Sequence, residues 1–590
     1  MRRTSRRLCL CLPLLMLAWQ AHAGVQLLVD GIADPLKAAA IAGVELSQYT
    51  TRTVSDAQVR RLYERAPDQV KAALEPYGYY DATVTGELQQ VGNDWHVTLH
   101  VRAGEPVKVS SVEVSLDPEA AQLTAVRQAR RNIERLKGRP LNHGAYQAAR
   151  DALSTQLTAN GFLDARLVTH RVEVTRASHS AEIKLAWEVG RRYRYGQVRF
   201  EGSQFNEGFL DRYLPFKSGD YFSQDQLLAL QQVLSGADYF AVVTVLPDAD
   251  GAGGGVVDVT VQLSPAKRTI YTGGPFIGTD TGLGMRGGLE RRWVNRRGHK
   301  WKNELVVAQR LKTLSTLYSI PMPGDNQRSF NFGANFRDAD TATSQSRTLG
   351  LVGNEARQWH GWTRTLGVRA LSGTFTVGRR GGEPDNAPGI ERGQSTLVFG
   401  EASLTRKQAD SPDFVQRGWL LTMTVRSTAG SLLSDTSFSE LTADAKWIHG
   451  FGANQRNRLI LRGSAGITRT DDFSALPPQL RFFAGGDRSI RGYGYQSIGP
   501  RNADGRVIGG TNLLVVSAEV EHYFTRQWGM AAFVDGGNAF RGTDYRPKLG
   551  AGLGMRWRSP VGMIRIDVGT PVRDDRVRGI QLHLVIGPDL

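Results

Sequence analysis

The sequence predicts three small α+β repeats, each of order β-α-α-β-β, followed by an all-β transmembrane barrel of about 16 antiparallel strands. Three observations lead to this prediction. Glycine is unevenly distributed, with 20 of the 66 glycines in residues 1–266 and 46 in residues 267–590. Short sequence markers recur in the first part. The second part alternates apolar and polar residues over most of its length.

Residues 1–23 have the pattern of a signal peptide for export. Four arginines precede an apolar stretch over residues 8–19 that is too short to span a bilayer, and Ala21-His22-Ala23 forms a small-x-small cleavage pattern. Both cysteines, Cys9 and Cys11, lie in this segment. The exported chain is therefore expected to contain neither a disulfide nor a thiolate metal site.

Hydropathy and charge exclude two broad classes of protein. After the N-terminus no apolar run approaches the ~20 residues of a membrane-spanning helix, which excludes a polytopic helical membrane protein but not a barrel. The formal net charge is +16, yet the basic residues are scattered and show no basic-aromatic RNA signature. We therefore expect a basic surface suited to anionic lipid or acidic partners, and no nucleic-acid partner.

The first part divides into repeats at residues 24–104, 105–190 and 191–266. A marker at 78–82 (Gly-Tyr-Tyr-Asp-Ala) returns at 161–165 (Gly-Phe-Leu-Asp-Ala) and, in degenerate form, at 236–240.

Each repeat is predicted to open with a strand, continue with helical segments, and end with two alternating strands after the glycine-aromatic turn. Opening strands are expected over 107–116 and 193–200, helical segments over 55–74, 146–158 and 223–234, and closing strands over 82–88 and 95–101. Such a unit leaves an edge strand that can accept an extended chain by strand addition. The alternative is that the edges belong to structural spacers.

The second part, residues 267–590, has the alternation of a barrel wall. Ile564, Ile566 and Val568, for example, alternate with Arg565 and Asp567. A soluble sandwich would turn the apolar face inward, whereas an outer-membrane barrel turns it toward lipid. Export, the lack of cysteine and the length of the block favour the barrel. At ~20 residues per strand and connection the block holds about 16 strands, although 14 or 18 would fit nearly as well.

One predicted strand carries Gly550, Gly552 and Gly554 on a single face, which indicates close approach by another backbone. The candidate to fold inward against it is the long segment between two predicted strands, 458–469 and 512–524. At the centre of that segment stands Ile490-Arg491-Gly492-Tyr493.

If that segment enters the barrel, Arg491 requires a carboxylate, because an unpaired charge in a confined site is costly. Asp535, on one strand face with Phe533, could accept a two-pronged guanidinium bond. Glu519 and Glu521 are competing partners. The alternative is that Arg491 lies in a solvated external loop and pairs with nothing.

At these residues the chain resembles the outer-membrane superfamily that joins POTRA repeats to a sixteen-stranded barrel. The tetrad Ile490, Arg491, Gly492 and Tyr493 matches the superfamily's sixth-loop motif, and Phe533, Asp535 and Gly537 match its Phe-x-Asp-x-Gly strand motif. Residues 554–562 are similar as well. The resemblance implies that the tetrad rests inside the barrel against Asp535, and that the first and last strands form a weak seam.

Three repeats and this length are similar to the TamA branch, the translocation and assembly module subunits. That resemblance implies a TamB-like partner anchored in the inner membrane, which the first repeat would meet, and clients that are unfolded autotransporters and other outer-membrane proteins. It also implies the outer membrane of a Gram-negative bacterium, with the repeats in the periplasm and outer-membrane lipid around the barrel. Two alternatives are a two-partner secretion transporter, with a dedicated secreted substrate, and a passive porin.

An enzyme is not expected, and no cofactor or metal is predicted. Residues 282–287 match G-x-G-x-x-G but lie in the glycine-rich strand region without a βαβ context. His96 and His100 fall on a predicted strand, which would hold them ~13 Å apart. Near the C-terminus Pro588 cannot donate to a strand ladder, so pairing is expected to stop near Ile586.

Overall fold

The computed structural model describes residues 24–590 except 51, 53, 93, 249–252, 324–326, 381–382, 384–386, 413, 431, 453–454, 561, 573–578 and 588–590. The predicted signal peptide therefore lies outside the described residues. No helix in the described ranges combines the length and the apolar character that crossing a membrane would need.

The first repeat has the predicted element order. It consists of β1 (Val25–Asp30), α1 (Leu36–Gly43), α2 (Asp56–Leu74), β2 (Thr83–Val91) and β3 (Asp94–Arg102). The sheet order is β1-β3-β2, with β1 parallel and β2 antiparallel to the central β3. Buried residues of α2 recur every three or four positions, so that one helical stripe contacts the sheet: Val59, Leu62, Ala66, Val70 and Leu74.

The second and third repeats are variations on this unit. The second consists of β4 (Lys108–Ser115), α3 (Pro118–Gln122), α4 (Thr124–Glu134), α5 (His143–Ala159), β5 (Arg166–Thr175) and β6 (Ser180–Glu188). The third consists of β7 (Arg194–Glu201), the 3-10 turn η4 (Leu210–Tyr213), α6 (Gln224–Gly236), β8 (Phe240–Asp248) and β9 (Val256–Pro265). Their sheet orders are β4-β6-β5 and β7-β9-β8, so the opening strand of each repeat is an edge strand.

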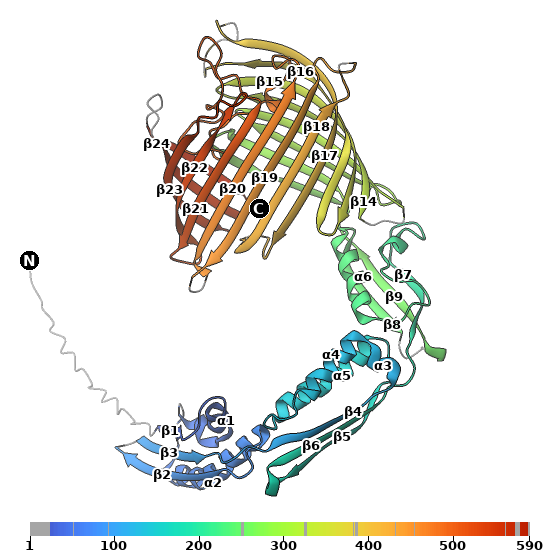
Figure 1. Ribbon diagram of the computed structural model, residues 1–590, viewed down its shortest axis with the longest axis vertical. Helices are drawn as coiled ribbons and strands as arrows, with labels where there is room; N and C mark the ends of the chain where they lie inside the picture. Colours follow the sequence, from blue (N-terminus) through green and yellow to red (C-terminus); the bar gives the residue numbers. More distant parts are fainter. Residues whose placement is uncertain are drawn as a thin grey trace, which may run out of the picture. The chain divides into compact units, whose positions relative to one another are not determined.

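The C-terminal part is one antiparallel sheet of 16 strands in sequence order, nearly closed into a barrel, as predicted (Figure 1). The strands are β10 (Thr269–Gly278), β11 (Gly282–Arg291), β12 (Lys300–Ala308), β13 (Leu311–Pro321), β14 (Arg328–Asp340), β15 (Ser344–Trp359), β16 (Trp362–Val377), β17 (Glu391–Ala409), β18 (Arg417–Thr428), β19 (Phe438–Phe451), β20 (Asn457–Thr470), β21 (Asn512–Tyr523), β22 (Trp528–Phe540), β23 (Lys548–Ser559), β24 (Gly562–Val572) and β25 (Gln581–Gly587).

The apolar face of the barrel wall is the outer one. On β23, Leu553 and Met555 are exposed while Arg556 between Met555 and Trp557 is buried, and on β24 Ile566 and Val568 are exposed while Asp567 is buried. This alternation, with apolar side chains outside and polar side chains inside, is typical of a barrel whose outer face contacts lipid. The G-x-G-x-x-G run at 282–287 forms part of β11, and β25 pairs with β24 as far as Gly587, one residue beyond the predicted end.

The connection between β20 and β21, residues 471–511, is the sixth connection on its side of the barrel, and we call it loop 6. Isolated bridges give it internal structure, including Phe482 with Gly510 and Ala484 with Ile498. Its first portion packs Leu476 and Leu480 against the inward-facing Phe399 of β17 and other wall residues. Loop 6 therefore folds into the barrel.

Candidate functional site

Neighbouring strands carry carboxylates on the inner face of the barrel wall. Alternation along β22 turns Phe533 and Asp535 inward, and both side chains are buried. Glu519 and Glu521 hold buried positions on β21, and Asp567 holds one on β24. Because burying an ionised carboxylate without a partner is costly, this face requires cations.

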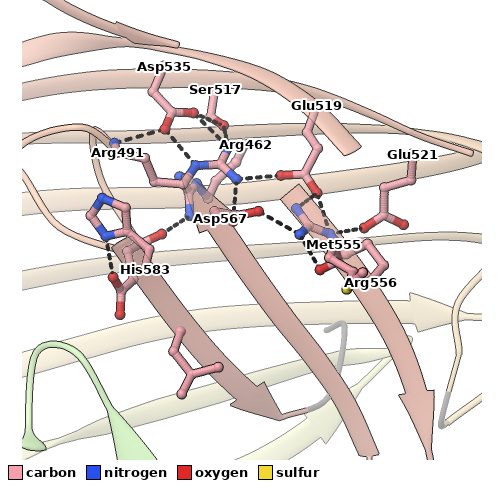
Figure 2. A network of polar contacts seen from close by, with 12 residues as sticks. Arg462, Arg491, Ser517, Glu519, Glu521, Asp535, Met555, Arg556, Asp567 and His583 are labelled. Atoms are coloured by element: carbon pink, nitrogen blue, oxygen red, sulfur yellow. Dashed lines mark hydrogen bonds and ion pairs between the residues drawn. The ribbon is translucent and has the colours of Figure 1, made fainter. Parts of the chain in front are cut away.

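Loop 6 supplies one of those cations through Arg491 (Figure 2). Its Nε and one terminal nitrogen donate to the two oxygens of Asp535 at 2.8 and 2.9 Å, which is the two-pronged geometry of a strong charge-assisted pair. The other terminal nitrogen donates to Glu519 at 2.6 Å and to Asp567 at 3.0 Å. The guanidinium carbon lies 3.5 Å from the ring centroid of Phe533.

The backbone of Arg491 is held as well as its side chain. Its amide N–H donates to Asp535 Oδ2 at 2.9 Å. The carboxylate of Asp535 thus fixes both the position of the loop and the direction of the side chain, while Ser517 donates to its second oxygen at 2.5 Å. Burial alone would lower the pKa of Arg491, but the surrounding carboxylates raise it above its ordinary value, so the residue remains a cation.

The cluster extends along the wall beyond Arg491. Arg556 of β23 donates to Glu519, Glu521 and Asp567, and Arg458 of β20 donates to Glu521. A further arginine of β20, Arg462, donates to loop 6 backbone carbonyl oxygens at Asp487 and Ser489. In sum, four buried or half-buried arginines face four buried carboxylates, and their formal charges cancel: Arg458, Arg462, Arg491 and Arg556 against Glu519, Glu521, Asp535 and Asp567.

In the structure Arg491 therefore contacts both Asp535 and Glu519, which we had expected to be alternative partners for it. Glu521 instead contacts Arg458 and Arg556. The Arg491 side chain is 5% exposed, so it does not lie in solvent.

The other tetrad residues seat the loop tip. Gly492 has a φ of +92°, and a Cβ there would lie 2.7 Å from the backbone carbon of Thr570, so only glycine fits. Ile490 and Tyr493 are buried in a small apolar cluster with Val515 of the wall. The Tyr493 hydroxyl donates to the Leu549 carbonyl oxygen at 3.3 Å.

The glycine face of β23 makes room for the site, although only one of its three glycines meets the loop. A Cβ on Gly550 would overlap the Arg491 carbonyl oxygen. At Gly552 the obstacles would be Val568 and Phe533, and at Gly554 they would be the side chains of Asp567 and Arg556. The inward approach that this glycine face predicts is therefore confirmed at Gly550, whereas Gly554 makes room for the ionic cluster.

A second arginine anchors the first portion of loop 6. Arg481 donates to three carbonyl oxygens of the loop itself, at Leu476, Ile508 and Ser474, at 2.7 to 3.0 Å. Burial lowers its pKa to about 10, which still leaves it protonated at neutral pH. Arg481 thus stabilises loop 6 through hydrogen bonds within the loop itself.

The sequence patterns did not single out Arg458, Arg462 and Arg556 as site residues. Strand alternation could have indicated them, because it shows which side chains of a strand face the lumen. Arg556 lies on the same face as the glycines of β23, and Asp567 alternates with apolar residues on β24. Within the described ranges no group of three or more His, Asp or Glu side chains is arranged to hold a metal ion.

Comparisons with known proteins identify the class to which this fold belongs. Residues 295–588 match the Omp85 superfamily domain, residues 26–103 match the POTRA domain described as TamA domain 1, and residues 193–266 match a POTRA family described as surface antigen variable number repeat. The chain belongs to the Omp85 superfamily.

Individual relatives are more distant. The chain is 23% identical over 428 residues to the outer membrane protein assembly factor BamA of Nitratidesulfovibrio vulgaris, a match that covers 69% of this chain and 52% of that protein. The chain thus spans about half the length of this curated relative.

A solved structure shares the fold. The crystal structure of BamA from Haemophilus ducreyi lacking POTRA domains 1–3 has a TM-score of 0.66 at 17% identity, covering 82% of this chain and 99% of that one. CdiB from Acinetobacter baumannii has a TM-score of 0.46 at 14% identity, covering 81% and 89%.

Proposed function

We propose that the protein is an outer-membrane protein assembly factor of the TamA type, which helps autotransporters and other outer-membrane proteins to insert. The observation that carries the proposal is a nearly closed barrel whose lumen holds its own loop 6, fixed by Arg491 to the wall. A barrel filled in this way is unsuited to steady diffusion. The superfamily membership and the match of residues 26–103 to TamA domain 1 support the assignment.

The mechanism requires no covalent chemistry. The sheet of the barrel ends at β10 and β25, and an end strand that separates from its neighbour offers backbone donors and acceptors to a client strand. The client's own folding supplies the driving force, while the barrel lowers the barrier by presenting an edge and thinning the bilayer locally.

The repeats would gather chains before insertion. Their opening strands lie at sheet edges, and several edge strands expose apolar side chains: Leu28 of β1, Val168 of β5 and Val242 of β8 are each more than half exposed. An exposed apolar residue on an unpaired edge suits strand addition by an extended partner. The proposed partner of the first repeat is a TamB-like protein anchored in the inner membrane, and the proposed location of the repeats is the periplasm.

A two-partner secretion transporter is the second candidate, because it shares the barrel and the repeats. Planar-bilayer conductance separates the two in part. A barrel held shut by Arg491 should show low conductance with brief openings, whereas a large steady pore would favour a transporter or a porin.

The partner is tested by photo-crosslinking in living cells. A photo-reactive residue at Leu28, on the β1 edge, should capture a TamB-like envelope protein. The same residue at Glu64, exposed on α2 of the same repeat, is the control and should capture none. Equal crosslinking from both positions, or capture of one dedicated secreted protein from Leu28, would contradict the proposal.

A further inference from the structure

A second polar contact of loop 6 joins the two ends of the barrel sheet. Asp487, four residues before Arg491, accepts hydrogen bonds from the Thr279 hydroxyl at 2.8 and 2.7 Å. Thr279 lies in the turn between β10 and β11. The same carboxylate lies 2.5 Å from Nδ1 of His583 on β25. One loop residue therefore contacts the first hairpin and the last strand.

The ring of His583 is held by loop 6 on both sides. Its Nε2 lies 3.0 Å from the amide nitrogen of Gly492, which can only donate. Nε2 must therefore be an acceptor, so the ring is neutral and carries its proton on Nδ1, which donates to Asp487. The His583 and Asp487 side chains are 5% and 7% exposed.

We propose that Thr279, Asp487 and His583 form a latch that couples docking of loop 6 to closure between β10 and β25. The inference rests on the proposed function and deepens it, by naming the residues that position the tetrad and the seam together. If β25 moves away from the β10 hairpin, Asp487 cannot keep both partners. Conversely, if loop 6 leaves, the two ends lose their shared acceptor. Among the described residues, a hydrogen bond of 3.5 Å from the Leu584 amide to the Thr279 hydroxyl then still joins the β10 hairpin to β25.

A neighbouring carboxylate opposes the latch. Asp280 follows Thr279, and burial together with the charge of Asp487 raises the pKa of Asp280 to about 6. A hydrogen bond from the backbone of Asp487 and the charge of Arg488 partly offset this effect. At about pH 8 Asp280 is ionised and repels Asp487, and at about pH 5 it is mostly protonated and does not. Asp280→Asn should therefore tighten the latch only at the higher pH.

The latch is tested on the purified full chain in lipid nanodiscs, with no client present. Ser489, half-buried beside the loop tip, is replaced by cysteine, and the rate of labelling by a bulky maleimide reports release of the loop. We expect His583→Phe and Asp487→Ala to raise this rate about tenfold or more. Asp487→Asn, which keeps an acceptor and gains a donor, should stay within about threefold of the reference.

The matched control is His522→Phe, the same substitution at an exposed histidine of β21, which should leave the rate unchanged. Asp280→Asn should slow labelling at about pH 8 and have no effect at about pH 5. Unchanged gel mobility of the unheated protein verifies that each barrel is folded.

Coupling is read from hydrogen exchange in the β25 peptide. Asp487→Ala changes loop 6 and not β25, so faster exchange in residues 581–587, with unchanged exchange in β20, is the result expected of a latch. Faster loop labelling with unchanged β25 exchange would overturn it, as would labelling of His583→Phe within twofold of the reference.

If a variant fails to fold, nitrogen NMR of His583 in the unsubstituted chain decides the question. The neutral Nδ1–H tautomer supports the latch, and the Nε2–H tautomer refutes it. Because these readouts involve no client, failure of the latch leaves client assembly to be judged separately.

Discussion

Replacing Arg491 with alanine should release loop 6 while leaving the barrel in the membrane. The substitution removes five side-chain hydrogen bonds, to Asp535 twice, Glu519, Asp567 and Ser517. It also leaves the cluster of four arginines and four carboxylates with one uncompensated negative charge. These contacts overlap, so their contributions do not add.

Breaking a buried ion pair by removing one partner costs about 3–5 kcal/mol, and this figure is the appropriate scale for the whole change. At about 1.4 kcal/mol per factor of ten, the docking equilibrium of loop 6 should fall by about two to three and a half orders of magnitude. The barrel ladder is untouched, because Arg491 lies outside the strands.

The assay is maleimide labelling of Ser489→Cys, together with the temperature at which the compact gel form is lost. Arg491→Ala should label far faster and lose compactness at a lower temperature. Arg491→Lys should have a labelling rate between those of the reference and Arg491→Ala, because an ammonium keeps the charge but not the two-pronged geometry. Arg501→Ala, an exposed arginine of the same loop, is the matched control. Labelling of Arg491→Ala within twofold of the reference would show that Arg491 does not hold loop 6 in place.

Two further substitutions test the wall. Gly550→Ala should displace the loop tip, because its Cβ would overlap the Arg491 carbonyl oxygen. The control is Gly463→Ala on β20, which should leave the loop in place, since no atom lies within 4 Å of a Cβ at that position. Both are measured by the rate of maleimide labelling of Ser489→Cys. Arg556→Met should lower the barrel's unfolding temperature in detergent by an amount corresponding to about 3–5 kcal/mol, because three carboxylates lose a partner. The control is the exposed Arg546→Met, and equal shifts for the two would count against the cluster's role.

Periodicity was sufficient to predict most of the fold. Helices α2, α5 and α6 lie within a few residues of the segments predicted at 55–74, 146–158 and 223–234, and loop 6 is flanked by β20 and β21 as expected. The 3-10 turn that stands in for a helix in the third repeat was not predicted, since so short a turn has no periodic signature.

The alternation of residues along the strands also predicted part of the site. Strand alternation places Phe533 and Asp535 on one inward face, and the need to compensate Arg491 points to a carboxylate. Alternation cannot give the register between strands, which decides that Arg556 of β23 lies between carboxylates of β21 and β24. It also cannot show that His583, on the last strand, meets a loop 96 residues earlier in the chain.

The central claim is that this barrel assists insertion of other barrels and needs its docked loop to do so. The most direct test is assembly of an unfolded autotransporter β-domain into liposomes that contain the purified full chain, followed by the appearance of its heat-resistant form. We expect faster assembly than in empty liposomes, and a return to the empty-liposome rate with Arg491→Ala. Equal rates in empty and loaded liposomes would contradict it.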